Sequence, residues 1–293
     1  MIKKKYIEFI FLIGLGAITS LSLPPLNFYV INFITLSLFF IFIVKKRNFQ
    51  KNHKLFFFYG WLFGFGYFLS NLYWISISLT FDEDFRFLSK IIVFLLPAFF
   101  ALFYGLITLL FLFFRTNNIL SSFLIFSVIF GILEFIRGSI LTGFPWNLFA
   151  YSFSNESEIL ILTSLIGTYG FNLLCISLFI TPGVIFLREG KKDIFICLLF
   201  PLIFLLSFIY GSFNKEKFNE LDSKKLDYKL RVVGSNISLD RFYKKLDTAQ
   251  IIDDLINLSN PKTSEKTIFL WPEGILPNIS QENLQYYEEN FKK

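Results

Sequence analysis

Seven long apolar stretches fill the first 211 residues and decide what kind of structure this chain can form. A membrane-spanning helix needs about 20 apolar residues and at least about 17. We place the spans at residues 6–23, 27–44, 55–79, 91–114, 119–138, 159–187 and 194–211. Hydrophobic residues make up 54% of the chain and charged residues only 17%, against about 25% charged in soluble domains. The chain is therefore predicted to be a polytopic α-helical membrane protein.

Basic residues gather at alternate ends of these spans. The N-terminal segment, the loop 45–54, Arg115 and the segment 188–192 together hold twelve basic residues. The opposite ends hold Arg86, Lys90 and Arg137, next to the acidic run at residues 82–84. Loops rich in Lys and Arg stay in the cytoplasm. We therefore expect a cytoplasmic N-terminus, and an odd number of spans places residues 212–293 outside the cytoplasm.

Residues 212–293 have the character of a soluble domain. Residues 228–233 alternate like a strand, residues 242–258 carry apolar side chains at helical spacing, and residues 267–271 form a second apolar strand. This order predicts a parallel sheet covered by helices. Two strands in about 80 residues cannot cover both faces of such a sheet. The chain thus divides into a transmembrane domain, 1–211, and a soluble portion, 212–293, that we expect to be incomplete.

The turn that follows the second strand contains the main candidate for catalysis. Phe269-Leu-Trp-Pro-Glu-Gly274 is an apolar strand running into Trp-Pro, which places the carboxylate of Glu273 at the strand end. Carboxylates at such ends are commonly solvated turn residues, and that is the alternative for Glu273. Glu273 lies in the one segment that has the character of a soluble fold, and this position favours a catalytic role for its carboxylate.

Other polar or aromatic residues lie near the fifth span. Glu134 and Arg137 are three residues apart on one helix, and ionisable residues in a membrane are costly unless paired. They are candidates for contact with a substrate or lipid headgroup, or for an ion pair at the helix surface. Trp146 and Tyr151 lie where aromatic residues mark a membrane interface. They are candidates for contact with a substrate or lipid, or for simple anchoring.

Several kinds of site are excluded or disfavoured. His53 is the single histidine and lies on a basic loop, which removes a Ser-His triad and a multi-His metal site. Cys175 and Cys197 fall inside apolar spans, where a thiol behaves as a small buried hydrophobe. The acidic run 82–84 is read as an exposed loop in preference to a cation site. The sequence has no Gly-rich phosphate loop, and the net charge of +6 comes from the basic loops, so neither a cofactor, a metal nor nucleic acid is expected.

Four segments resemble the bacterial apolipoprotein N-acyltransferases, enzymes of the nitrilase (carbon-nitrogen hydrolase) superfamily. They match in order along the whole chain, and the string Leu-Thr-Gly-Phe-Pro-Trp is the most specific. The segments are Gly64-Phe-Gly-Tyr-Phe68 with Trp74, Glu134-Phe-Ile-Arg-Gly138 with Leu141-Thr-Gly-Phe-Pro-Trp146 and Tyr151, Val232 to Ile237, and Trp271-Pro-Glu273. The resemblance implies a multi-pass domain in the bacterial inner membrane and a periplasmic nitrilase-like αββα domain, of which this chain holds the N-terminal part.

The resemblance also implies a reaction and its partners. Such enzymes transfer an acyl chain from a phosphatidylethanolamine-type phospholipid to the α-amino group of a diacylglyceryl lipoprotein. Their triad is Glu-Lys-Cys: Glu273 would accept the proton of the thiol, the Cys would carry the acyl group as a thioester, and the Lys would stabilise the oxyanion. The Lys and Cys have no counterpart in this sequence, so the 293-residue chain alone is expected to be inactive.

Two other interpretations stay open at this point. The chain is an inactive, truncated remnant or fragment of such an enzyme, or it is a polytopic transporter with a small appendage. Transporters commonly place polar or ionisable groups near the membrane midplane. Apart from Glu134 and Arg137, the predicted spans carry few such groups, which disfavours transport.

Overall fold

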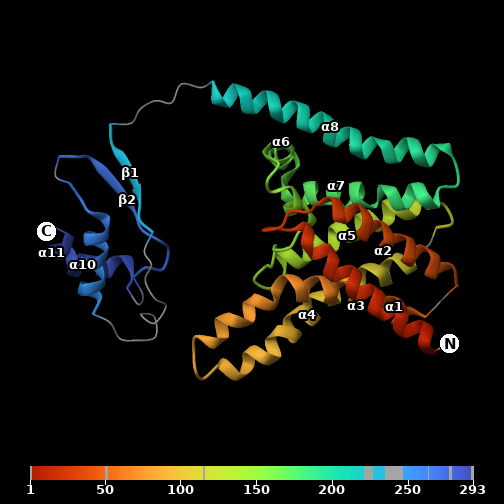
Figure 1. Cartoon of the computed structure of the whole chain (residues 1–293), viewed down its shortest axis with the longest axis horizontal. Coiled ribbons are helices and arrows are strands. Elements are labelled where there is room, and N and C mark those ends of the chain that lie inside the picture. The colour runs from red at the N-terminus through yellow and green to blue at the C-terminus, as the bar shows by residue number, and fades with distance from the viewer. Residues whose placement is uncertain are drawn as a thin grey trace. The chain divides into compact units, whose positions relative to one another are not determined.

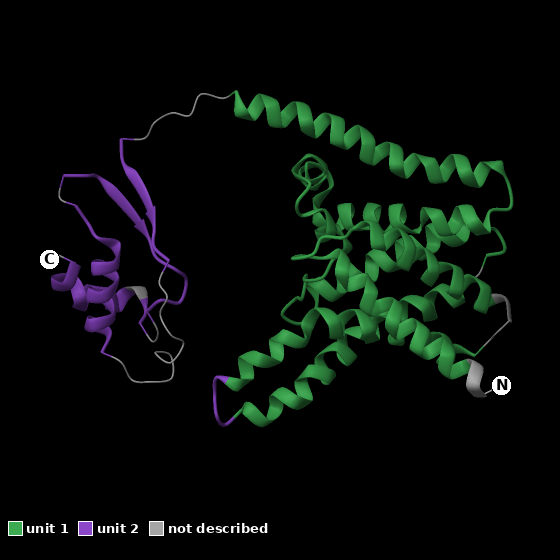
Figure 2. Ribbon diagram, in the orientation of Figure 1, with its two compact units in different colours: residues 1–80, 85–220 green, residues 81–84, 221–293 purple. Residues whose placement is uncertain are grey.

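The computed structural model describes residues 2–49, 52–114, 116–220, 227–234, 247–262, 264–276 and 279–291. Arg115 and the predicted segments 235–237 and 242–246 lie outside the described residues. The chain divides into two compact units, one of residues 1–80 and 85–220 and one of residues 81–84 and 221–293 (Figure 2). Each unit is described separately below.

Unit 1 is a bundle of long helices (Figure 1). The long helices are α1 (Ile2–Thr19), α2 (Val30–Phe49), α3 (His53–Leu72), α4 (Arg86–Phe113), α5 (Ile119–Ser139), α7 (Leu162–Leu187) and α8 (Lys191–Asn219). Shorter helical segments lie between them: the 3-10 helices η1 (Ser20–Ser22), η2 (Tyr73–Thr80) and η3 (Phe149–Phe153), and the short α-helix α6 (Ser157–Leu160). The expectation of a polytopic helical membrane protein is confirmed.

Six helical segments of the described chain are long and apolar enough to cross a membrane. They are Lys5–Ser22, His53–Thr80, Arg86–Phe113, Ile119–Ser139, Leu162–Leu187 and Lys191–Asn219. The remaining predicted span, residues 27–44, forms α2, which is not among the six. Because α2 ends in Lys45-Lys46-Arg47, every 18-residue stretch of it contains three basic residues. Its apolar part is therefore short for a membrane helix.

The structure also changes two predicted boundaries. The span at 159–187 is broken at its start, because Gly167 adopts a non-helical conformation with φ 71° inside α7. The last span continues past residue 211 to Asn219. Its polar end packs on α6: a Cβ on Gly211 would lie 2.0 Å from the carbonyl oxygen of Glu158, and Lys215 Nζ lies 2.7 Å from the Glu158 carboxylate.

Close approach of the backbones holds α3 against α4. A Cβ on Gly60 would lie 2.1 Å from the carbonyl oxygen of Tyr104, and one on Gly64 would lie 2.7 Å from Tyr104 Cβ. Small residues at helix contacts allow this spacing in membrane proteins, where apolar burial alone does not drive helices together. Glycine on α3 therefore lets the aromatic face of α4 come into contact with it.

A serine of α2 joins that helix to α7. Ser37 Oγ donates to the carbonyl oxygen of Phe179 at 3.0 Å and accepts from the backbone N–H of Gly183 at 2.9 Å. These two backbone groups are the ones that an undisturbed helix would pair with each other. The hydroxyl is thus inserted into the hydrogen-bond ladder of α7 beside Pro182, a known cause of helix bending.

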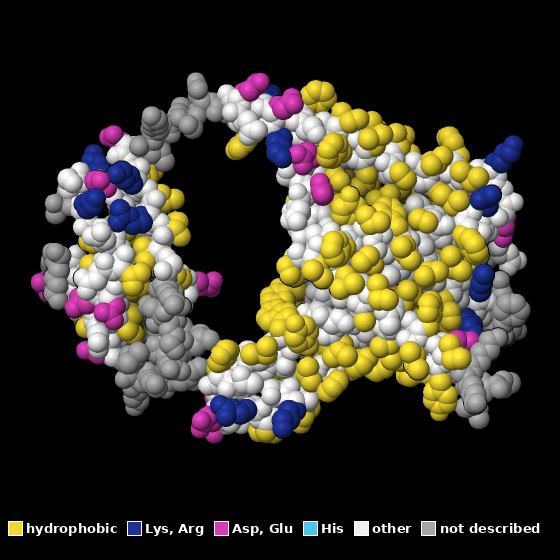
Figure 3. All heavy atoms as spheres, in the orientation of Figure 1, with side chains coloured by type: hydrophobic (Ala, Val, Ile, Leu, Met, Phe, Trp, Pro, Cys, Tyr) yellow, Lys and Arg dark blue, Asp and Glu magenta, His cyan; other side chains and the backbone are white. Residues whose placement is uncertain are grey.

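The surface of unit 1 matches a membrane environment. Hydrophobic side chains cover much of the face seen in Figure 3, and Lys and Arg side chains lie toward its ends. Of the six spans, α8 is the least buried. Such a broad exposed apolar surface is expected where lipid replaces water as the solvent.

Unit 2 contains the predicted strand–helix–strand arrangement. Strands β1 (Lys229–Val232) and β2 (Thr267–Leu270) pair in parallel, with Leu230 opposite Ile268. Helix α10 (Thr248–Ser259) connects them, and η4 (Gln281–Tyr287) and α11 (Glu288–Phe291) follow β2. The buried core described here is small: Ile251, Leu255 and Ile275, with Trp271 and Leu276 packed against it.

Candidate functional site

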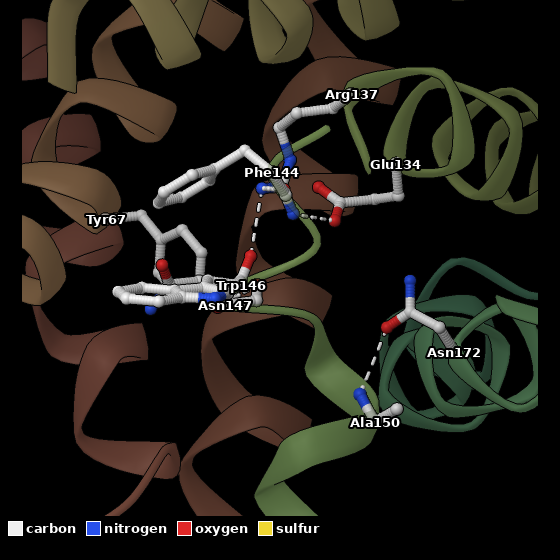
Figure 4. A network of polar contacts seen from close by, with 8 residues as sticks. All are labelled: Tyr67, Glu134, Arg137, Phe144, Trp146, Asn147, Ala150 and Asn172. Carbon is white, nitrogen blue, oxygen red and sulfur yellow. Dashed lines mark hydrogen bonds and ion pairs between the residues drawn. The ribbon is translucent and has the colours of Figure 1, made fainter. Parts of the chain in front are cut away.

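Arg137 connects the end of α5 to the loop that follows it, the α5–η3 loop (residues 140–148). Its Nη1 donates to the carbonyl oxygens of Phe144 at 2.8 Å and Trp146 at 2.9 Å. The side chain of Arg137 is fully buried. One guanidinium group therefore fixes two carbonyls of the Leu-Thr-Gly-Phe-Pro-Trp string from inside the bundle (Figure 4).

Glu134 provides the counter-charge. Its carboxylate accepts from Arg137 Nη2 at 2.5 Å, and its side chain is 1% exposed. The pair is thus an interior one and neither member reaches the surface. Removing one partner of a buried ion pair strands the other charge, so Glu134 and Arg137 act on the loop as a unit.

Side chains of two further helices form hydrogen bonds with the backbone that follows Trp146. Tyr67 of α3 donates from its hydroxyl to the carbonyl oxygen of Asn147 at 2.9 Å. Asn172 of α7 accepts from the backbone N–H of Ala150 through Oδ1 at 3.0 Å. Figure 4 shows the Tyr67 side chain near Asn147 of the loop and the Asn172 side chain directed at Ala150 of η3. Helices α3, α5 and α7 together therefore determine the path of this segment.

The α5–η3 loop has an unusual backbone. Leu141 and Asn147 have φ of 59° and 60°, which is uncommon for residues other than glycine, and Gly143 has φ 76°. A Cβ on Gly143 would also lie 2.7 Å from the carbonyl oxygen of Gly138. Strained conformations persist where the surroundings fix them and cluster at functional sites. The buried contacts of Arg137 and Tyr67 provide that fixation.

Aromatic rings cover the outer side of the loop. Trp146 stacks on Trp74 of η2 with 5.6 Å between the ring centroids, and both are about half exposed. Phe144 stacks on buried Phe100 of α4 at 4.3 Å. Tyr151 is partly buried on η3, and this burial raises the pKa of its hydroxyl, which therefore stays a neutral hydrogen-bonding group. The loop thus presents a Trp pair to its surroundings.

A cavity of about 280 Å³ adjoins the loop. Arg137, Gly143 and Phe144 form one wall, and apolar side chains of α4 form another: Leu96, Phe99, Phe100 and Phe103. Its chemistry, mostly aromatic and aliphatic with one cation at the wall, suits an acyl chain. Neither Trp146 nor Tyr151 lines it.

Several buried polar atoms around the pair lack a partner among the described residues. They are Arg137 Nε, Asn147 Oδ1 and Asn172 Nδ2, while the Tyr104 hydroxyl interacts with the Glu134 carboxylate. Buried polar atoms are commonly satisfied by internal water. The interior beside Glu134 is therefore a polar region within an otherwise apolar bundle.

Glu273 lies in unit 2, in the turn directly after β2. Gly274 completes the turn with φ 67°. The Glu273 side chain is exposed, and no described residue is hydrogen-bonded or ion-paired to its carboxylate. The described part of unit 2 therefore does not cover the Glu273 carboxylate.

The strand end that carries Glu273 is nevertheless firmly held. Trp271 Nε1 donates to Ser259 Oγ at 2.8 Å, and Arg231 Nη1 donates to the carbonyl oxygens of Ser259 and Asn260 at 2.8 and 2.9 Å. Both β1 and β2 are thereby tied to the C-terminal end of α10. Trp271 also helps to line a cavity of about 380 Å³ in which Glu273 takes no part.

The remaining candidates have ordinary surroundings. Cys175 and Cys197 are buried in α7 and α8 with no exposed surface, as predicted. His53 is exposed at the start of α3 and packs on Phe113, with 5.0 Å between ring centroids. Among the described residues no group of three His, Cys, Asp or Glu side chains is placed to hold a metal ion.

Sequence reasoning missed Tyr67, Asn172 and Tyr104 as parts of this site. Tyr67 lies within the Gly64–Phe68 segment but was not distinguished from its aromatic neighbours. Asn172 carried a usable signal, because an amide in the middle of an apolar span needs a hydrogen-bond partner. Attention to uncharged polar residues in the spans, as well as to ionisable ones, would have identified it.

Comparisons with known proteins agree with this architecture. A family model described as Apolipoprotein N-acyltransferase N-terminal domain matches residues 15–181. The Apolipoprotein N-acyltransferase of Rickettsia typhi is 32% identical over 285 residues, covering 94% of this chain and 53% of that protein. Proteins of the same description from Allorhizobium ampelinum and Rhodopseudomonas palustris are each 28% identical, over 92% and 89% of this chain and 52% and 50% of their own lengths. The chain thus spans about half the length of the curated relatives it matches.

Proposed function

The chain belongs to the apolipoprotein N-acyltransferase family, and from this we propose that it supplies the membrane half and the catalytic glutamate of an enzyme that N-acylates lipoproteins. The family match over residues 15–181 is the observation that carries the proposal. On this proposal residues 1–211 form the membrane domain and residues 212–293 begin a nitrilase-like domain. The acyl donor is a phosphatidylethanolamine-type phospholipid, and the acceptor is a diacylglyceryl lipoprotein.

The proposed chemistry has Glu273 accept a proton and return it in each half of the reaction. It accepts the thiol proton while the thiolate attacks the ester carbonyl of the phospholipid, and it returns that proton to the departing alkoxide, so that a thioester forms and a lysophospholipid leaves. It then accepts a proton from the α-amino group as that nitrogen attacks the thioester, and passes it to the expelled thiolate, which becomes a thiol again. The thiol and the oxyanion-stabilising Lys belong to the portion of such an enzyme that the chain does not match. That portion would also cover Glu273, which is exposed in unit 2.

We assign different roles to the four residues near α5. The exposed Trp146 and the partly buried Tyr151 contact lipid or substrate beside the α5–η3 loop. Glu134 and Arg137, being buried, act on substrate indirectly by holding that loop in place. The cavity walled by Phe144 and α4 is the place where an acyl chain fits.

A chimera tests whether the chain performs this role. Residues 1–293 would replace the matching half of the Rickettsia typhi protein, so that its remaining half supplies the thiol. Transfer from fluorescent phosphatidylethanolamine to a diacylglyceryl lipopeptide is then expected. Glu273→Gln should lower the rate by about 10²–10⁴, the usual contribution of a general base.

Glu282→Gln is the matched control, because Glu282 is another exposed carboxylate of unit 2. It should leave the rate unchanged. A chimera that inserts into membranes but transfers no acyl chain would contradict the proposed function. Full activity of Glu273→Gln would contradict the role of Glu273 alone.

The proposed orientation places the N-terminus in the cytoplasm and residues 212–293 in the periplasm of a cell with an inner membrane. It requires α2 to cross the membrane despite its three terminal basic residues, which then remain cytoplasmic. Alkaline phosphatase, which is active only outside the cytoplasm, should be inactive when fused after Lys54 and active when fused after Asn219. Activity after Lys54 would show that α2 does not cross.

A further inference from the structure

A second cavity, of about 310 Å³, lies at the end of the bundle where α2 and α7 terminate and α5 begins. We call it the α2–α7 end cavity. Its lining includes Lys45 and Arg47 of α2, Asn117 and Ile119 at the start of α5, and Leu187 and Glu189 at the end of α7. From its charges and position we propose that it binds the phosphodiester headgroup of an anionic phospholipid.

Arg47 gives the cavity a fixed positive charge. It is 3% exposed, and its Nη2 donates to the carbonyl oxygen of Thr116 at 2.7 Å. Its guanidinium carbon also lies 5.0 Å from the ring centroid of Phe111. A guanidinium held in this way is preorganised for a phosphate, whose oxygens match its planar N–H groups.

Lys45 and the start of α5 add to this positive charge. The Lys45 side chain is exposed, and its Nζ lies 5.3 Å from the ring centroid of Phe186. Helix α5 begins beside Ile119, with Asn118 as its N-cap, and the N-terminal end of a helix favours anions. Among the described residues that line the cavity, two cations outnumber the one carboxylate, that of Glu189, which favours an anionic phosphodiester.

The surroundings identify the source of that phosphate as a lipid. Phe114, next to the connection between α4 and α5, and Phe186, next to Leu187, are both highly exposed. Exposed apolar rings beside the cavity contact the hydrocarbon layer of a membrane, and phospholipid headgroups lie directly outside that layer. Basic pockets between membrane helices bind such headgroups. The acyl chains of a lipid bound here would run along the exposed apolar side of the bundle.

Native mass spectrometry of the delipidated 293-residue protein in detergent tests the proposal. Phosphatidylglycerol should bind more tightly than phosphatidylethanolamine or phosphatidylcholine of the same acyl chains. Lys45→Gln should weaken phosphatidylglycerol binding about fivefold, the effect of one basic residue near a membrane surface. Glu189→Gln should strengthen it. Both positions are exposed, so neither change disturbs the buried Arg47.

Lys192→Gln provides the control, since Lys192 is an exposed lysine at the start of α8 that does not line the cavity. It should leave the affinity unchanged. Equal losses for Lys192→Gln and Lys45→Gln, or equal affinity for the three lipids, would overturn the proposal. Displacement of the lipid by an equal concentration of glycerol phosphate would assign the cavity to a soluble phosphate instead.

Discussion

The 293-residue chain by itself is expected to form no acyl-thioester and to N-acylate no lipopeptide. Its two thiols, Cys175 and Cys197, are buried in membrane helices and cannot serve the chemistry proposed for Glu273. Residues of a catalytic triad act as a unit, and loss of the nucleophile alone costs roughly 10⁶ in turnover in a hydrolase. The purified chain would be incubated with fluorescent phosphatidylethanolamine and a diacylglyceryl lipopeptide, and both protein and peptide examined for label.

The chimera described above serves as the positive control in the same membranes. Hydroxylamine, which cleaves thioesters, should remove label from the chimera. The chain alone should carry no label that hydroxylamine removes. Labelled peptide produced by the chain alone would show a catalytic route that uses neither the proposed thiol nor the proposed Lys. Acyl label on a double variant of the chain, Cys175→Ser with Cys197→Ser, would likewise show a route that needs no thiol.

Replacing Glu134 with Leu is expected to lower the free energy of unfolding by about 3–5 kcal/mol. The change leaves the Arg137 guanidinium buried without its carboxylate, and breaking a buried pair from one side has this cost. Arg137 would also turn from the carbonyls of Phe144 and Trp146, so the α5–η3 loop should loosen. Unfolding by titration with SDS in mixed micelles measures the first effect. The part of the intrinsic tryptophan fluorescence that is lost on Trp146→Phe reports the second.

Two matched variants separate the effect of the Glu134 charge from the other effects of the substitution. Glu134→Gln keeps the shape and one acceptor, so it should cost less than Glu134→Leu. Glu216→Leu makes the same substitution at an exposed carboxylate of α8 and should change stability little. A Glu134→Leu protein as stable as wild type would mean that the pair does not hold the loop.

The membrane architecture followed from the sequence because lipid imposes a simple rule. A spanning segment must satisfy its own backbone and must be apolar along its length, and six of the seven predicted spans meet that rule in the structure. Helix α2 differs because its terminal Lys45, Lys46 and Arg47 belong to the helix itself and not to the following loop. Helix ends are not determined by hydropathy, since a polar segment continues a helix wherever it finds contacts, as α8 does on α6.

The candidate site was predictable only in its parts. Glu134, Arg137 and Trp146 were identified from residue type and short spacing, and the first two do pair. Their separation from solvent was not foreseeable, because it depends on helices from distant positions in the chain: α3 brings Tyr67 to the loop, and α7 brings Asn172 to η3. In unit 2 the alternation of apolar residues predicted two strands, but alternation carries no information on whether the turn after β2 is covered.

The insertion of Ser37 into α7 links protein synthesis to the completion of the bundle. Ser37 and Gly183 are 146 residues apart, so at 5–20 residues per second the ribosome needs roughly 7–30 s to make the second after the first. During that interval the Ser37 hydroxyl of α2 has no backbone of α7 to bind. The hydrogen bonds that join α2 to α7 can therefore form only late in translation, when α7 emerges, although α2 is among the first segments to leave the ribosome.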